Sequence, residues 1–232
     1  MVDNVLSYIK GSVGDRSNSV INRLFGSFIN SEHMRRTSII SEFAASQLAL
    51  KEGPSLIQSL VEVLNLDRNP SMDGWLLEMW FFASMRSGGV KFRVKNGAKD
   101  SWAEATVHTF DPENVPKDFP DNGIWLKPLK WNQGGYDAVY VNKVTKVIRF
   151  IQVTRGATHS FKIQYFNSLL WKFAEYFETT TLEIYFLVPE QQVEVFKISS
   201  VVGHGLLSAF PEWKICEELD QIKIAGVIGY PF

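Results

Sequence analysis

The chain has 232 residues, of which 24 are Lys or Arg and 25 are Asp or Glu, and its formal net charge is −1. This balance is not the basic footprint typical of a nucleic-acid-binding domain, so it weighs against that class without excluding it. The single Cys216 excludes an intramolecular disulfide and a Cys-rich zinc site, and it fits a reducing intracellular compartment. The longest apolar stretches fall short of the roughly 20 residues of a membrane-spanning helix, and no signal peptide is evident.

Residues 1–68 are expected to form a helical extension or cap, because apolar residues recur at three- and four-residue steps from Val20 onward. Gly53-Pro54 interrupts this spacing, and Pro54 suits the first turn of a new helix. No G-x-x-x-x-G-K-[ST] phosphate-binding loop occurs, which excludes an NTPase of that class.

Residues 69–232 are expected to form a second unit, in which helical and strand-like patterns alternate. Its first helix is capped by Ser71 or Asp73 and ends near Gly88-Gly89. The expected strands cover residues 90–94, 102–110, 124–129, 136–141, 147–154, 181–188, 193–198 and 222–228, and a long helix covers residues 160–177. This order predicts an α/β fold with a mixed sheet flanked by helices.

Glu78 is a carboxylate in a helix that is apolar nearly all round, within the run WLLEMWFF at residues 75–82. Such a helix is expected to be buried, and a buried carboxylate is costly unless a cation or hydrogen-bond donors meet it. Glu78 is therefore a candidate site residue. The alternative is a partly exposed Glu at the helix edge, or one paired with Arg86 or Arg93.

Asp137 follows Gly134-Gly135 at the start of an expected strand, where Asp is disfavoured. One alternative is an Asp that only caps the Gly-Gly turn. A hairpin turn at residues 142–145 pairs Asp137 with Phe150, and Gln152 then lies two residues along on the same face. Such diagonal neighbours lie about 7–8 Å apart, a span that one divalent ion can bridge. A one-residue slip would place Gln152 on the opposite face.

Glu78, Asp137 and Gln152 together present oxygen ligands of the kind that suits Mg²⁺ or Mn²⁺. A metal held in this way can activate water and neutralise charge on a phosphate. The long helix expected from about Ser160 would direct its N-terminal N–H groups toward the same site, which favours an anion. The three residues therefore predict a metal-dependent site that acts on phosphate.

A helical Glu, an Asp after a Gly-rich turn and a pair of residues on the next strand resemble the PD-(D/E)XK nuclease superfamily. The run GWLLE at residues 74–78 with Gly88-Gly89, and the run QVT at residues 152–154 followed by His159, resemble the C-terminal nuclease-like domain of Crinkler effectors and the related retrotransposon-hot-spot proteins. The resemblance covers roughly residues 70–190. It implies a restriction-endonuclease-like core of order α-β-β-β-α-β within residues 69–232, a divalent metal, and DNA as the substrate.

The third motif of the superfamily is (D/E)-X-K, whereas this chain has QVT at residues 152–154. Thr154 therefore stands where a lysine orients the attacking water and stabilises the developing negative charge. The resemblance leaves His159 and Lys162 as candidates for that catalytic role, and Arg155 and Lys162 as candidate contacts to the nucleic acid. The alternatives are a His159 satisfied by backbone near a helix N-terminus, and a Lys162 on a solvated helix face.

Two functions are consistent with these features. The first is Mg²⁺- or Mn²⁺-dependent hydrolysis of DNA phosphodiester bonds by the endonuclease domain of a Crinkler-type effector, which the resemblance implies is a secreted virulence protein acting in the host-cell nucleus. The second is a catalytically degenerate nuclease fold that binds DNA or a host protein without turnover. The missing motif lysine and the near-neutral charge favour the second.

Overall fold

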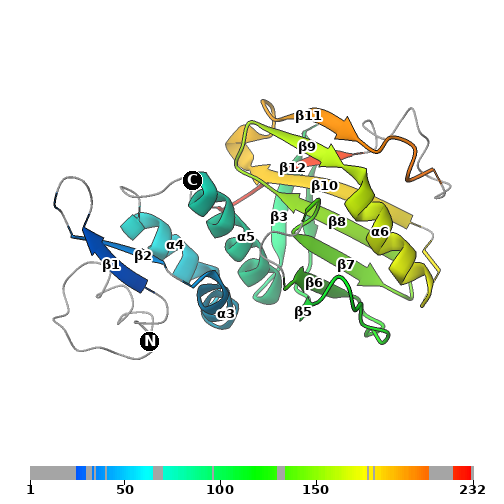
Figure 1. Cartoon of the computed structure of the whole chain (residues 1–232), viewed down its shortest axis with the longest axis horizontal. Helices are drawn as coiled ribbons and strands as arrows, with labels where there is room; N and C mark the ends of the chain where they lie inside the picture. Colours follow the sequence, from blue (N-terminus) through cyan, green and yellow to red (C-terminus); the bar gives the residue numbers. More distant parts are fainter. Residues whose placement is uncertain are drawn as a thin grey trace.

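The computed structural model describes residues 25–29, 33, 35–39, 41–64, 70–95, 97–129, 134–176, 178–179, 181–208 and 222–230. Figure 1 shows an α/β arrangement in which a large mixed sheet carries helices on both of its faces. This confirms the fold class at the level of a mixed sheet flanked by helices. No helix within the described ranges is long and apolar enough to cross a membrane.

The N-terminal part contains strands where helix was expected. β1 (Phe25–Ile29) pairs antiparallel with β2 (Arg35–Ile39) as a separate two-stranded sheet. The helical prediction for these residues is therefore wrong. Gly26 disfavours a helix interior, and His33 adopts a positive φ of 61° between the two strands, as residues in tight connections do. Residues 1–24 lie outside the described residues.

Helices follow as expected on both sides of Gly53. α3 (Glu42–Glu52) begins after Ser41, whose side chain accepts a hydrogen bond from the Ala44 N–H, and it ends at Gly53 with φ of 85°. α4 (Pro54–Leu64) starts with proline at its first position. Both helices contribute to the same hydrophobic cluster as the next helix, α5 (Pro70–Arg86). Residues 41–64 thus pack directly against the helix that carries Glu78.

α5 begins at Pro70, so Ser71 and Asp73 lie inside its first turn rather than capping it. The predicted end is confirmed, because Gly88 and Gly89 have φ of 126° and 87° and the Gly89 N–H bonds the Ser84 carbonyl.

The large sheet has eight strands in the order β4-β3-β12-β10-β8-β7-β6-β5. β6, β7 and β8 form an antiparallel run, whereas β8, β10 and β12 are parallel. The strands are β3 (Val90–Val94), β4 (Lys99–Trp102), β5 (Val107–Phe110), β6 (Ile124–Pro128), β7 (Ala138–Asn142), β8 (Val147–Val153), β10 (Thr181–Pro189) and β12 (Lys223–Val227).

One predicted strand, residues 102–110, is divided between the two opposite edges of this sheet. β4 ends at Trp102 and β5 begins at Val107, so five residue steps of at most about 18 Å join the edges. Eight strands laid flat would place those edges about 34 Å apart. The sheet must therefore curl, and the ring centroids of Trp102 on β4 and Trp125 on β6 lie 5.4 Å apart across the curl. The intervening Ala105 N–H bonds the carbonyl of Met85 at the end of α5.

Each face of the curled sheet has its own hydrophobic cluster. On one face, α5 covers Trp102, Trp125, Ile151 and Tyr185. On the other, α6 (Ile163–Ala174) covers residues such as Phe150 and Phe186. The residues of the candidate site come from α5 and from strands of this sheet or the residues next to them.

The segment after β8 departs from the prediction. Residues 158–162 form strand β9 (Thr158–Lys162), which pairs in parallel with β11 (Lys197–Val202), and α6 starts only at Ile163. The helix predicted from Ser160 therefore begins three residues too early, because residues 158–162 pair with β11 instead of joining the helix. The strand predicted at 193–198 is also displaced: a 3₁₀ turn (Glu190–Gln192) precedes it, and β11 begins at Lys197.

Candidate functional site

Glu78 meets a cation that the sequence reasoning did not name. Its carboxylate Oε1 accepts a hydrogen bond from Lys127 Nζ of β6, and the two side chains are 20% and 14% exposed. The ammonium also lies 4.8 Å from the centroid of the Phe82 ring, one turn along α5. Of the alternative partners weighed for Glu78, Arg93 instead bonds Glu194 at 2.6 Å, so the alternative of an Arg93 pair is wrong.

Asp137 lies immediately before β7 and bonds the next strand. Its Oδ2 accepts hydrogen bonds from the Val153 N–H at 2.6 Å and from Gln152 Nε2 at 3.0 Å. The Asp137 side chain thus links the start of β7 to the end of β8. Its role is therefore larger than capping the Gly-Gly turn. Asp137 and Gln152 lie in direct contact.

The register that joins Asp137 to Gln152 differs from the prediction by two residues. Val139, not Asp137, pairs with Phe150, and the last pair of the ladder is Ala138 with Ile151. The hairpin loop is longer than expected because Asn142 pairs with Val147 and Lys146 takes a positive φ of 56°. An even shift keeps every side chain on its face, so Gln152 still reaches Asp137.

The Gly-Gly turn before Asp137 is shaped by α6. Gly135 has φ of 90°, and a Cβ there would lie 2.6 Å from the Cβ of Tyr165. A Cβ on Gly134 would lie 2.4 Å from the same tyrosine ring. Only glycine lets the chain pass this close to α6 with that backbone angle. The next residue, Tyr136, is buried against Phe150 with ring centroids 5.3 Å apart, and it anchors the strand on which Asp137 sits.

The electrostatics of the site centre on Asp137. Burial raises the pKa of its carboxyl from 3.8 to about 8, and the negative charge of Glu78 adds to the rise. The Val153 N–H, the positive charge of Lys127 and the Gln152 amide oppose it. Glu78, Lys127, Asp137 and Gln152 therefore form one interacting group, which we call the acidic cluster.

The acidic cluster offers oxygen atoms that nearby residues leave unused. One oxygen of each carboxylate, Glu78 Oε2 and Asp137 Oδ1, accepts no hydrogen bond from any described residue. His, Cys, Asp and Glu form no group of three that could hold a metal in the described part of the chain. A divalent metal at the cluster would therefore rely on these two oxygens, the Gln152 amide oxygen and water, a set that suits Mg²⁺.

Thr154 and Arg155 follow β8 and are engaged within the protein. Thr154 is 8% exposed, and its Oγ1 accepts a hydrogen bond from the Gly156 N–H at 3.1 Å. Arg155 Nη1 lies 3.0 Å from Asp73 Oδ2, which ties the end of β8 to α5. Thr154 therefore stabilises the turn after β8, and Arg155 helps to position this end of the sheet beside α5.

His159 and Lys162 lie on β9 rather than at a helix N-terminus. His159 Nδ1 lies within hydrogen-bond distance of the Ser160 carbonyl at 2.8 Å, and its ring packs 5.8 Å from that of Phe186. Phe186 pairs with Gln152 across β10 and β8, so His159 lies near that end of the sheet. Lys162 is exposed and directly precedes α6.

Lys127 is the member of the acidic cluster that sequence reasoning missed. It occupies the run Ile-Trp-Leu-Lys-Pro of β6, in which the other four residues are buried. A lysine in a buried strand is the same kind of signal as Glu78 in an apolar helix, since each charge needs a partner of opposite sign. These two signals mark both residues as needing a partner, but they do not identify the pair.

Comparisons with known proteins give no relative. No family model matches the chain, and neither the curated proteins nor the solved structures contain a match.

Proposed function

We propose that the protein is a divalent-metal-dependent nuclease that hydrolyses phosphodiester bonds of DNA at the acidic cluster. The observation that carries the proposal is the meeting of Glu78, Asp137 and Gln152 beside Lys127, with one oxygen of each carboxylate left unbonded by the described residues. Mg²⁺ or Mn²⁺ held there would supply positive charge to a phosphate and lower the pKa of a water.

The arrangement of elements is compatible with a restriction-endonuclease-like core in residues 69–232, with residues 1–68 as an extension. α5 carries Glu78, the antiparallel run β6-β7-β8 carries Lys127, Asp137 and Gln152, and α6 leads to β10 in parallel with β8. This order supports the proposed core, although β3, β4 and β5 come between α5 and β6, and β9 comes between β8 and α6. A Crinkler-type effector acting in a host nucleus is the biological setting that the sequence resemblance suggests.

Lys127 is the residue best placed to replace the lysine missing at Thr154. Its ammonium contacts Glu78 and acts on the charge of Asp137, so a phosphate bound at the proposed metal would have this cation nearby. Such a preorganised cation stabilises that charge more strongly in a partly buried site than in water. Glu78, Asp137 and Gln152 would hold the metal, and Lys127 would orient water or phosphate.

A cleavage assay tests this proposal. The full chain is incubated with double- and single-stranded DNA in Mg²⁺, Mn²⁺ or EDTA, and Asp137→Ala is compared with Asp118→Ala, which removes an exposed loop carboxylate. We expect metal-dependent cleavage that Asp137→Ala reduces at least about 100-fold and Lys127→Met reduces about 100-fold, with Asp118→Ala unchanged. Absence of cleavage by the unaltered chain, or equal cleavage by Asp137→Ala, contradicts the proposal.

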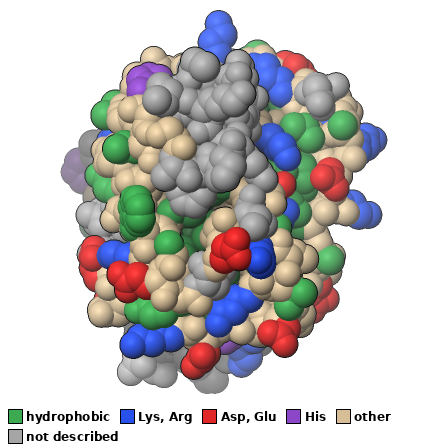
Figure 2. Space-filling view, turned by 90° about the vertical axis from the view of Figure 1, so that its right-hand side faces the viewer, with side chains coloured by type: hydrophobic (Ala, Val, Ile, Leu, Met, Phe, Trp, Pro, Cys, Tyr) green, Lys and Arg blue, Asp and Glu red, His purple; other side chains and the backbone are tan. Residues whose placement is uncertain are grey.

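A binding function without turnover is the second candidate, and two observations favour it. Lys127 already supplies a cation to Glu78, which lessens the need for a metal. Figure 2 shows Lys and Arg interspersed with Asp and Glu on the described part of one face, rather than gathered by sign. This candidate predicts that DNA or a host protein binds equally well in EDTA and in Mg²⁺, without any cleavage.

A further inference from the structure

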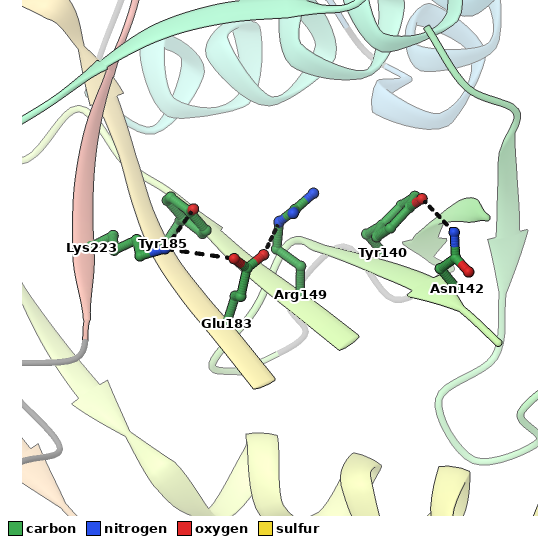
Figure 3. Close-up of polar contacts among 6 residues, drawn as sticks. All are labelled: Tyr140, Asn142, Arg149, Glu183, Tyr185 and Lys223. Carbon is green, nitrogen blue, oxygen red and sulfur yellow. Dashed lines mark hydrogen bonds and ion pairs between the residues drawn. The ribbon is translucent and has the colours of Figure 1, made fainter. Parts of the chain in front are cut away.

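A second group of charged side chains lies on the α5 face of the sheet, and Figure 3 shows it in close-up. We call it the cationic cluster, and it consists of Tyr140, Asn142, Arg149, Glu183, Tyr185 and Lys223. These residues come from β7, β8, β10 and β12. Arg149 lies three residues before Gln152 on β8, about 10 Å along the strand, so the two clusters are separate.

Glu183 is the only carboxylate of the cluster, and both of its oxygens are engaged. Arg149 Nε lies 2.5 Å from Oε2, and Lys223 Nζ lies 3.5 Å from Oε1. Two cations thus share one anion, which leaves the cluster with one net positive charge. The hydrogen bond to the Tyr185 oxygen and the charge of Glu183 raise the pKa of Lys223, although burial acts to lower it, so Lys223 stays protonated.

Arg149 presents an open guanidinium fork. An arginine usually binds a carboxylate through two parallel N–H groups, but Arg149 uses only Nε toward Glu183. Its terminal nitrogens bond no acceptor among the described residues, and Figure 3 shows them directed away from Glu183. The terminal N–H groups of Arg149 are therefore available to bind a carboxylate or phosphate.

Three aromatic rings hold this fork in place. The guanidinium carbon of Arg149 lies 5.1 Å from the Trp102 ring centroid, 5.2 Å from that of Tyr140 and 5.9 Å from that of Tyr185. Trp102 reaches this position because the sheet curls, as its contact with Trp125 shows. Rings on its faces restrict the side chain and leave its N–H edge as the place where a ligand can bind.

The two tyrosines add further donors. Tyr185 Oη accepts a hydrogen bond from Lys223 Nζ at 3.2 Å, and Tyr140 Oη accepts one from Asn142 Nδ2 at 3.2 Å. Each phenol therefore keeps its own O–H to donate, and neither O–H has an acceptor among the described residues. Gly123 permits the Tyr140 position, because a Cβ there would lie 2.1 Å from the hydroxyl.

Donors thus remain unused in this cluster, while both oxygens of its single carboxylate are occupied. A ligand that completes the cluster must bring acceptors and negative charge, and it must carry no donors that need partners. From this balance we infer that the cationic cluster is a binding site for a phosphate group, held by the open edge of Arg149 and by the hydroxyl of Tyr140, with Tyr185 and Lys223 on the other side of Arg149 (Figure 3). Water reaches the site, since Arg149, Glu183 and Lys223 are 17%, 20% and 47% exposed.

Phosphate binding is measured by calorimetry on the full chain in EDTA, which keeps the outcome independent of the proposed nuclease activity. The probes are inorganic phosphate, a 5′-phosphorylated oligonucleotide and the same oligonucleotide with a 5′-hydroxyl. We expect inorganic phosphate to bind, and Arg149→Lys and Tyr140→Phe each to weaken it by about tenfold, the effect of one lost hydrogen bond to a charged group. Preference for the 5′-phosphorylated strand over the 5′-hydroxyl strand identifies a polynucleotide end as the source, and equal binding of the two identifies free phosphate.

Matched variants separate this site from the rest of the molecule. Asp118→Ala removes an exposed loop carboxylate, and Glu178→Gln alters the exposed Lys146–Glu178 pair, whose side chains are 44% and 69% exposed. Both variants should bind phosphate as the unaltered chain does. The inference is overturned if the unaltered chain binds no phosphate, or if folded Arg149→Lys and Tyr140→Phe variants bind it undiminished.

Discussion

The acidic cluster and the cationic cluster both include strands of the large sheet. Each pairs charges of opposite sign, but anionic groups are in excess in the first and cationic groups in the second. The first sets the carboxyl groups of Glu78 and Asp137 against the single ammonium of Lys127, and Asp137 carries its charge above its pKa of about 8. The second sets Arg149 and Lys223 against the single carboxylate of Glu183. Unused acceptors remain in the first and unused donors in the second, so one suits a cation and the other an anion. Counting the donors and acceptors that have no partner among the described residues thus distinguishes two sites that a list of charged residues would not separate.

Gly135→Ala should give the largest loss of stability, because it disturbs the turn that positions Asp137 in the acidic cluster. The new Cβ would meet Tyr165 at 2.6 Å in a backbone with φ of 90°. We expect a loss of about 2–4 kcal/mol in the free energy of unfolding, measured by urea denaturation. Gly97→Ala is the matched control, since Gly97 has φ of 88° and an added Cβ there would have no heavy atom within 4 Å. That control should cost only about 1 kcal/mol, and equal losses would show that the Tyr165 contact is unimportant.

Arg149→Met should destabilise the cationic cluster by an intermediate amount. Removal of one partner of a buried ion pair costs about 3–5 kcal/mol. Solvent reaches Arg149 and Glu183, which are 17% and 20% exposed, so we expect about 2–3 kcal/mol by the same measurement. Glu178→Gln, in the exposed pair with Lys146, should change stability by no more than about 0.5 kcal/mol. A loss in Arg149→Met no larger than in Glu178→Gln would contradict the buried role of Arg149.

Asp137→Asn should stabilise the protein by a smaller, pH-dependent amount. The pKa of Asp137 is about 8 in the folded chain, against an ordinary value of 3.8. Between these values the folded state binds a proton that the unfolded state has lost, so stability falls as the pH rises. Asparagine does not titrate, and the variant should gain about 1–2 kcal/mol near pH 8 and nothing below pH 4. Thermal denaturation in EDTA from pH 4 to pH 9 checks this, and a gain that is constant with pH would contradict it.

Local patterns predicted much of the fold, and long-range contacts account for the errors. β3 and β12 and the break at Gly53 were predicted nearly to the residue, because alternation, glycine and proline act within a few residues. The run 102–110 was predicted as one strand because nothing local shows that Ala103–Thr106 must cross from one edge of the sheet to the other. Residues 158–162 form a strand only because β11, almost 40 residues later, pairs with them.

The sequence predicted that Asp137 and Gln152 lie close together, but it did not predict the register of the two strands that carry them. Alternation along a strand survives an even shift in register, so the two-residue error left both side chains in reach of each other. Lys127 was missed because its partner Glu78 is on a helix 49 residues earlier in the chain, a separation for which sequence periodicity gives no signal. The cationic cluster was missed for the same reason, as its six residues come from four strands spread along the chain from β7 to β12.

The order of strands in the sheet has a consequence for how the protein is synthesised. The middle strands β10 and β12 come last in the chain among the strands of the sheet, while the outer strands β3–β8 are made first. On the ribosome, the β3-β4 hairpin and the β5–β8 group would emerge as two unconnected half-sheets with β3 and β8 unpaired on their inner sides. Such unpaired strands invite misassembly until they find their partners. A chain paused before Lys223–Val227 should therefore depend on chaperones far more than the finished one.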